Sequence, residues 1–312
     1  MSMETASRAL FMAAAHGRPF HVQITGGEPL LAGELVFDIL ELIREERWPV
    51  STAIQTNGVL LERDAAQKFR RYGTAVGVSV DGLPEVQEQL RGGSVATYRA
   101  MKLLDEERVP FSVTAVVSDV NARKLKGLAM GLHSLPMASG IGLDLLVRKG
   151  SAAEGSDVSF PGEDALREGI RQLLETLDVL NAARRTPFVL REREHVLRAA
   201  NAGGRRTGSF CSACGGRSLA VTPEGELYPC TQTMGDWDFM LGTLDTPLFD
   251  CGSALSSLTA EGAWCDGCEL QGRCPGDCPS RLYYNTEENR RLICVLYRTI
   301  FDYCKQKGGV VV

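Results

Sequence analysis

The chain has 312 residues, of which 44% are hydrophobic and 23% are charged, as is typical of a globular protein with room for two domains. Its formal net charge of −5 argues against a nucleic-acid partner bound through phosphate contacts. No apolar run approaches the roughly 20 residues that a membrane-spanning helix needs, so we expect no membrane partner.

The first 150 residues alternate between helical and strand patterns. Apolar periodicity predicts helices over 3–15, 33–46, 61–72, 95–107 and 121–134. Between them, strands are predicted over 20–24, 50–55, 75–80, 111–117 and 141–147. This alternation predicts an α/β fold with a parallel sheet built from right-handed crossover units.

The predicted strands end in polar, glycine-rich segments. The first three are followed by Gly26-Gly27-Glu28-Pro29, Thr56-Asn57-Gly58 and Asp81-Gly82. In parallel α/β folds the carboxyl ends of the strands carry the chemistry, and glycines let backbone approach a ligand closely. The alternative is that these glycines and Asp81 only form tight turns.

Residues 151–208 read as a helical linker. A polar stretch over 150–160 precedes helices predicted over 162–183 and 188–202. The charged run 191–194 is expected to be a solvated helix face. A break at 201–206 then leads into the remaining part of the chain, 209–312.

All ten cysteines lie at position 211 or beyond. With Glu4 beside Arg8 the amino terminus has no basic stretch of the kind found in export signals, so we expect a cytoplasmic protein. In a reducing compartment, dense thiols indicate metal binding rather than disulfides. Cys251 and Cys304 are expected to be ordinary, partly buried thiols. The other eight follow the spacing of metal ligands: Cys211, Cys214, Cys230, Cys265, Cys268, Cys274, Cys278 and Cys294.

Eight thiols suffice for two four-ligand sites, which can hold iron–sulfur clusters or zinc. The series that ends in Cys265-x2-Cys268-x5-Cys274-x3-Cys278 and Cys294 resembles the SPASM domain of radical SAM peptide-modifying enzymes. The resemblance implies that 209–312 form a small cysteine-rich α+β domain with two auxiliary 4Fe–4S clusters. It assigns one cluster to Cys211, Cys214, Cys230 and Cys278, and the other to Cys265, Cys268, Cys274 and Cys294.

Residues 1–150 resemble a partial radical SAM (β/α)6 barrel whose first strand is missing. The matching motifs are Gly26-Gly27-Glu28-Pro29, the run from Gln55 to Gly58, and the run from Ser79 to Gly82. The resemblance implies that S-adenosylmethionine (SAM) is bound by Gly26, Gly27, Glu28, Pro29, Gln55, Asn57, Ser79 and Asp81.

One departure from the family is plain. The Cys-x3-Cys-x2-Cys loop that holds the SAM-cleaving third 4Fe–4S cluster is absent, since no cysteine precedes Cys211. We interpret the sequence as truncated at its amino terminus. We therefore expect SAM and the third cluster only in a full-length form, and no 5′-deoxyadenosyl radical from this chain.

The resemblance implies a maturase that modifies a ribosomally made precursor peptide, by thioether formation, with a flavodoxin- or ferredoxin-type external electron donor. Sulfatase maturation is disfavoured because Thr231 stands where sulfatase-maturating members carry an aspartate base. Two alternatives stay open: an electron-transfer or scaffold iron–sulfur protein without SAM chemistry, and a zinc-binding interaction module. The sequence names no catalytic residue.

Overall fold

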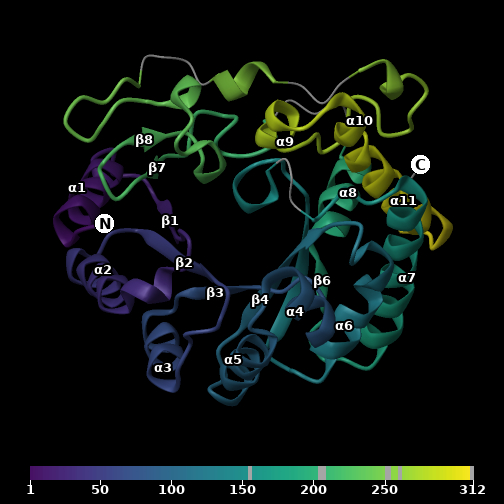
Figure 1. The fold of residues 1–312 in the computed structure, drawn as a ribbon, viewed down its shortest axis with the longest axis horizontal. Helices are drawn as coiled ribbons and strands as arrows, with labels where there is room; N and C mark the ends of the chain where they lie inside the picture. Colours follow the sequence, from purple (N-terminus) through teal and green to yellow (C-terminus); the bar gives the residue numbers. More distant parts are fainter. Residues whose placement is uncertain (154–156, 203–208, 250–253, 259–261, 310–312) are drawn as a thin grey trace.

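A computed structural model describes residues 1–153, 157–202, 209–249, 254–258 and 262–309 (Figure 1). Its main feature is a six-stranded sheet in which neighbours along the chain are neighbours in space, in the order β1-β2-β3-β4-β5-β6, with every pair parallel. The strands are β1 (Phe20–Ile24), β2 (Val50–Thr56), β3 (Ala75–Ser79), β4 (Phe111–Val117), β5 (Ala138–Leu145) and β6 (Val189–Leu190).

Helices provide the crossovers that a parallel sheet requires. In Figure 1, α2, α3, α5, α6 and α7 lie around the outside of the curved sheet. The helices of this part are α1 (Met3–Ala14), α2 (Gly33–Glu46), α3 (Arg63–Tyr72), α4 (Pro84–Arg91), α5 (Ser94–Glu106), α6 (Leu125–His133), α7 (Glu163–Ala182) and α8 (Arg191–Asn201). This architecture confirms the predicted α/β half-barrel, with strand boundaries that match the sequence patterns closely.

A continuous apolar core lies between the sheet and these helices. Phe69 of α3, Met101 of α5 and Leu173 of α7 are fully buried in it, together with Val78 and Val113 of the central strands. Each buried side chain of this size stabilises the fold by about 1.5–3 kcal/mol relative to an exposed one. Burial of these side chains therefore stabilises the half-barrel without a contribution from a metal.

Two elements differ from the sequence expectation. Helix α4 was not predicted because only Val86 and Gln87 of its eight residues are buried, which leaves almost no apolar periodicity. Strand β6 lies in the range expected to be a helical linker, and it pairs with Gly140 and Ile141 of β5. Two residues are too few to show a strand pattern. Residues 151–208 thus contain the sixth strand of the sheet.

The cysteine-rich part has little regular structure. It contains β7 (Ala220–Val221), β8 (Leu227–Tyr228), α9 (Pro279–Tyr284), α10 (Glu287–Arg290) and α11 (Leu292–Gln306). Figure 1 shows it as a green-to-yellow segment across the top of the view, with α11 returning beside α7 and α8. Within the described ranges, no helix combines the length and apolar character needed to cross a membrane.

Candidate functional site

Glu28 joins the ends of two neighbouring strands. One carboxylate oxygen accepts hydrogen bonds from the Thr56 hydroxyl at 2.6 Å and from Leu30 N–H at 3.1 Å, and the other accepts from Asn57 N–H at 2.7 Å. Glu28 thereby fixes the loop after β1 against the end of β2. A carboxylate with this many donors is held in one orientation, so its main effect is to position the loop.

The two glycines before Glu28 leave open space above the loop. A Cβ atom added at Gly26 or Gly27 would meet no other heavy atom within 4 Å. Gly26 also has φ 156°, a conformation that other residues rarely adopt. The backbone here is therefore exposed and accessible to a ligand.

Gln55 and Ser79 lie side by side on β2 and β3. The Gln55 amide donates to the Ser79 hydroxyl at 2.9 Å. Gln55 fits against Gly77 so closely that a Cβ on Gly77 would lie 2.2 Å from the Gln55 side-chain oxygen. With Glu28 and Asn57, these residues line the carboxyl edge of the first three strands, as expected for a parallel sheet.

Asp81 is held by partners within the protein. It is 4% exposed, and its carboxylate accepts from Arg91 Nε at 2.6 Å and from Val116 N–H at 2.7 Å. Its backbone carbonyl accepts from the Asn121 amide at 2.8 Å. These contacts tie the end of β3 to β4, so Asp81 has a clear structural role here.

The cysteine-rich part contacts the same edge of the sheet. Just beyond β5, Lys149 donates to the carbonyl oxygens of Gln232 and Met234 at 2.8 and 3.1 Å, and to the Tyr284 hydroxyl at 3.1 Å. Burial lowers the pKa of Lys149, against the opposing negative charges of Asp236 and Cys230. Sequence reasoning missed Lys149; its position directly after a predicted strand was the available signal.

Four cysteines assigned to one predicted cluster form what we call the first thiol group: Cys211, Cys214, Cys230 and Cys278. The pKa of Cys230 is raised, mainly by burial, with further contributions from the negative charges of Cys278 and Cys211. Cys211 and Cys230 pack against the same small apolar cluster. The Cys214 thiol contacts the carbonyl of Leu255, which belongs to that cluster, at 3.5 Å.

The second thiol group contains the other four: Cys265, Cys268, Cys274 and Cys294. Burial raises the pKa of Cys294 to about 12, and the negative charges of Cys274, Cys265 and Cys268 add to the effect. Arg298 forms a side-chain hydrogen bond with Cys268. This hydrogen bond is the main reason that the pKa of Arg298 is raised. Cys265 and Cys294, which are 29 residues apart in sequence, therefore lie close enough for their charges to interact.

The nine cysteines of the described part are all free thiols. Within the same part, no three His, Cys, Asp or Glu side chains are grouped so that they could hold a metal ion. Cys304 is 1% exposed in the core, more deeply buried than the sequence suggested, whereas Cys251 lies outside the described residues. In composition, each group matches the donor set of an iron–sulfur cluster, which is four cysteines on short loops.

A buried ion pair lies on the segment that joins the two thiol groups. Asp277 is 3% exposed and accepts from Arg281 Nε at 2.6 Å. Asp277 lies between Cys274 of the second group and Cys278 of the first in sequence. The pair therefore fixes the short loop from which both groups draw a thiol.

The run 191–194 is not the solvated helix face that its charges suggested. Glu192 is 3% exposed and accepts from Leu143 N–H at 2.9 Å and from Arg191 Nε at 2.7 Å. Arg191 also pairs with Asp144 of β5 at 2.8 Å. Strand β6 ends at Leu190. The Glu192 carboxylate therefore accepts the hydrogen bond from Leu143 N–H that a longer strand β6 would accept.

Comparison with known proteins identifies the first part of the chain. Residues 1–129 match the radical SAM superfamily. The serine-type anaerobic sulfatase-maturating enzyme of Klebsiella aerogenes is 29% identical over 304 residues, covering 89% of this chain and 70% of the relative. An uncharacterized protein of Methanocaldococcus jannaschii is 31% identical over 157 residues, covering 48% of this chain and 54% of that protein.

Solved structures share the fold over a longer stretch. The enzyme anSMEcpe with bound AdoMet superposes with a TM-score of 0.76 at 20% identity, covering 98% of this chain and 88% of that one. Streptococcus suis SuiB bound to S-adenosylmethionine gives 0.63 at 14% identity, covering 89% and 65%. Residues 1–129 therefore match the radical SAM superfamily, and the chain as a whole is similar in sequence and fold to anaerobic sulfatase-maturating enzymes.

Proposed function

We propose that this chain is the SAM-binding and auxiliary-cluster part of a maturase that modifies a ribosomally made peptide by forming a thioether. The observation that supports the proposal is that one chain combines a strand edge of the SAM-binding type with eight cysteines that form no disulfide. Related structures were solved with peptides: anSMEcpe with the Kp18Cys peptide, and SuiB with its precursor peptide SuiA.

The residues after β1, β2 and β3 are assigned to SAM. Gly26 and Gly27 offer accessible backbone, and Glu28 and Pro29 shape the loop, which by family resemblance meets the amino group of the methionine moiety. Gln55, Asn57 and Ser79 complete the edge. For Asp81 we propose a positioning role through Arg91 and Val116, which keeps the end of β3 in place.

We assign one auxiliary 4Fe–4S cluster to each thiol group, in a SPASM-type domain over 209–312. When bound, such clusters accept an electron or bind a substrate thiolate, and an external flavodoxin- or ferredoxin-type donor supplies the electrons. Thioether formation breaks one C–H and one S–H bond and forms a C–S bond, so the peptide loses two hydrogen atoms. In a full-length form, the C–H hydrogen atom would go to the radical derived from SAM, the thiol proton to solvent, and the one remaining electron to an oxidised auxiliary cluster.

A third cluster needs three more thiols. Every cysteine of this chain lies at 211 or beyond, and eight of the ten belong to the two groups. We therefore expect the 312-residue chain alone to give no 5′-deoxyadenosine from SAM.

Sulfatase maturation is the second candidate, favoured by the identity of 29% with a sulfatase-maturating enzyme. Against it, the residue after Cys230 is Thr231, at the start of a short 3₁₀ helix (Thr231–Thr233), and a hydroxyl is a poor base beside a carboxylate. An iron–sulfur scaffold and a zinc-binding module remain as further alternatives, and metal analysis separates them.

The test compares two forms of the protein. The 312-residue chain, loaded with iron and sulfide, is incubated with SAM, a reductant and a cysteine-containing peptide encoded beside its gene. We expect neither 5′-deoxyadenosine nor a change in peptide mass. The same chain extended by an upstream in-frame Cys-x3-Cys-x2-Cys segment should remove two hydrogen atoms from the peptide. Conversion of a sulfatase peptide instead would favour the second candidate, and 5′-deoxyadenosine from the shorter chain would contradict our account.

A further inference from the structure

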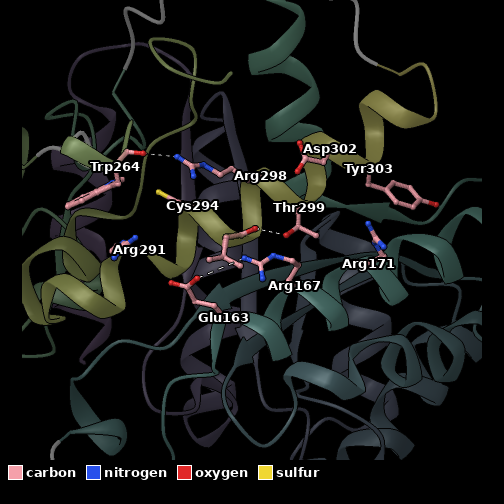
Figure 2. Close-up of a pocket in the computed structure, with 11 residues that line it drawn as sticks. Glu163, Arg167, Arg171, Trp264, Arg291, Cys294, Arg298, Thr299, Asp302 and Tyr303 are labelled. Atoms are coloured by element: carbon pink, nitrogen blue, oxygen red, sulfur yellow. Dashed lines mark hydrogen bonds and ion pairs between the residues drawn. The ribbon is translucent and has the colours of Figure 1, made fainter. Parts of the chain in front are cut away.

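A cavity of about 240 Å3 lies between α7 and α11, on the outer side of the half-barrel. Figure 2 shows Arg167 and Arg171 on the α7 side, with Arg291 and Arg298 along the beginning and middle of α11. Trp264 and the sulfur of Cys294 line the same cavity. We call this the arginine pocket. In Figure 1, α7 and α11 lie on the opposite side of the molecule from β1 and β2.

The pocket is basic although the whole chain carries a net charge of −5. Its four guanidinium groups face two carboxylates, Glu163 and Asp302. Arg167 is engaged by Asp164 at 2.8 Å, and Arg298 donates to the Trp264 carbonyl at 2.6 Å. Positive charge concentrated in a hollow attracts an acidic surface and raises its association rate.

Two of the arginines are available for a partner. Among the described residues, the side chains of Arg171 and Arg291 make no hydrogen bond or ion pair, and both residues are exposed. The hollow that continues beyond Trp264 is lined by Asp266, Glu269 and Arg298, and Glu269 pairs with Lys305 at 2.6 Å. A docked acidic protein would therefore meet its strongest positive charge on the α7 side of Trp264.

Cys294 connects this pocket to the second thiol group. Cys294 is one of the four cysteines of that group, and its sulfur lines the pocket wall. Electron transfer between proteins weakens steeply with distance, so an entry point should lie where a redox group comes closest to the surface. Complexes of this kind are held by small, charged contact areas rather than by large apolar ones.

We propose that the arginine pocket is the docking site of an acidic one-electron carrier protein that reduces the iron held by the second thiol group. The inference rests on the proposed function, since it assigns that group to an iron–sulfur cluster. One electron leaves the reduced carrier and enters the group, and no bond or proton is transferred. A substrate peptide is a weaker match, because β1 and β2, whose ends carry most of the residues assigned to SAM, lie on the opposite side of the molecule.

The test measures binding and does not depend on catalysis. Oxidised flavodoxin is titrated into the iron-loaded chain, and the dissociation constant is followed as the NaCl concentration is raised. The pocket variant is Arg171→Glu with Arg291→Glu. Its matched control, Arg99→Glu with Lys102→Glu, reverses two exposed charges on α5, which lies away from the pocket. Arg171→Glu alone is a second variant that lies far in sequence from every cysteine.

We expect salt-sensitive binding that the pocket variant weakens about tenfold or more, the single variant about threefold and the control less than about twofold. Iron content should match the wild type in all variants, and reduction by photoreduced flavodoxin should slow in parallel with binding. Equal effects of pocket and control variants would contradict the docking site, as would a glutamate-rich peptide that binds as tightly as flavodoxin. Iron-loaded wild type that fails to bind contradicts docking alone, whereas wild type without iron contradicts the proposed function.

Discussion

The half-barrel and the cysteine-rich part are built in different ways. The half-barrel buries apolar side chains from its strands and from the helices α3, α5, α6 and α7 in one core. Among the residues that the structure describes, the cysteine-rich part has two-residue strands and a separate apolar cluster of five buried residues: Ala213, Ala220, Tyr228, Phe239 and Leu255. Small cores contribute little stability, so we propose that metal ligation contributes to the folding of this part.

Helix α11 belongs to both parts. Leu296 and Ile300 are fully buried in the core of the half-barrel, while Cys294 near its start belongs to the second thiol group. Through α11, the cysteine-rich part is therefore anchored in the core of the half-barrel. From this difference we expect that loss of metal disorders the loops of the cysteine-rich part and leaves the six-stranded sheet intact.

The largest expected effect comes from removing one ligand. Cys278→Ala should lose about half of the bound iron, because the first thiol group would keep only three thiolates. Iron analysis with electron paramagnetic resonance measures this directly. Cys304→Ala is the matched control: it removes a buried thiol outside the eight and should retain all of the iron. Equal iron content in the two variants would contradict the assignment of Cys278 as an iron ligand.

A substitution in the apolar core tests how the half-barrel is stabilised. Phe69→Ala should lower the free energy of unfolding of the half-barrel by about 3–5 kcal/mol, because Phe69 is fully buried and leaves a cavity. Urea unfolding followed by far-UV circular dichroism measures the change, and iron content in native buffer should stay the same. If the protein instead loses its iron without a change in unfolding, the two parts do not differ as described.

The loop after β1 should show a smaller effect. Glu28→Gln keeps the shape of the side chain but weakens its charged hydrogen bonds to Thr56 and Asn57, at a cost of about 1–3 kcal/mol. We expect a lower melting temperature and weaker SAM binding in equilibrium dialysis. Glu45→Gln, at an exposed position on α2, should change neither. Unchanged SAM binding in Glu28→Gln would contradict our proposal that this loop contributes to the SAM site.

The smallest effect depends on pH. Burial raises the pKa of Tyr98 from 10.0 to about 12, and its hydroxyl donates to the Gly82 carbonyl at 2.8 Å. The folded state holds this proton more tightly than the unfolded state, so the contribution is present below pH 10 and lost as pH rises through 12. After discounting for solvent screening we expect about 1 kcal/mol. Tyr98→Phe should remove that pH dependence, and an unchanged slope would contradict the assignment.

Sequence patterns predicted the sheet well, because five strands have long apolar runs between amphipathic helices. They did not predict β6, whose two residues carry no periodicity, or α4, whose exposed face is polar throughout. The role of Glu192 was also hidden, since nothing local distinguishes a glutamate that bonds a distant strand from one in solvent. Such contacts depend on tertiary packing, which a local pattern does not contain.

The site was predictable to a similar degree. Glycine and carboxylate residues at strand ends were identified because parallel topology brings those ends to one edge. The contacts of Lys149 with Gln232, Met234 and Tyr284 were not, because they join segments more than 80 residues apart. Arg171 on α7 and Arg291, directly before α11, are also distant in sequence, and the packing of α11 on α7 brings them to one pocket.

The most direct test is the metal content of the 312-residue chain purified without oxygen. Two 4Fe–4S clusters predict roughly eight iron and eight sulfide per chain, with a brown protein whose visible absorption bleaches on reduction. Chelation should then disorder 209–294 and leave the half-barrel folded. A colourless protein that contains zinc, or a metal-free protein whose cysteine-rich part is already ordered, would contradict the account.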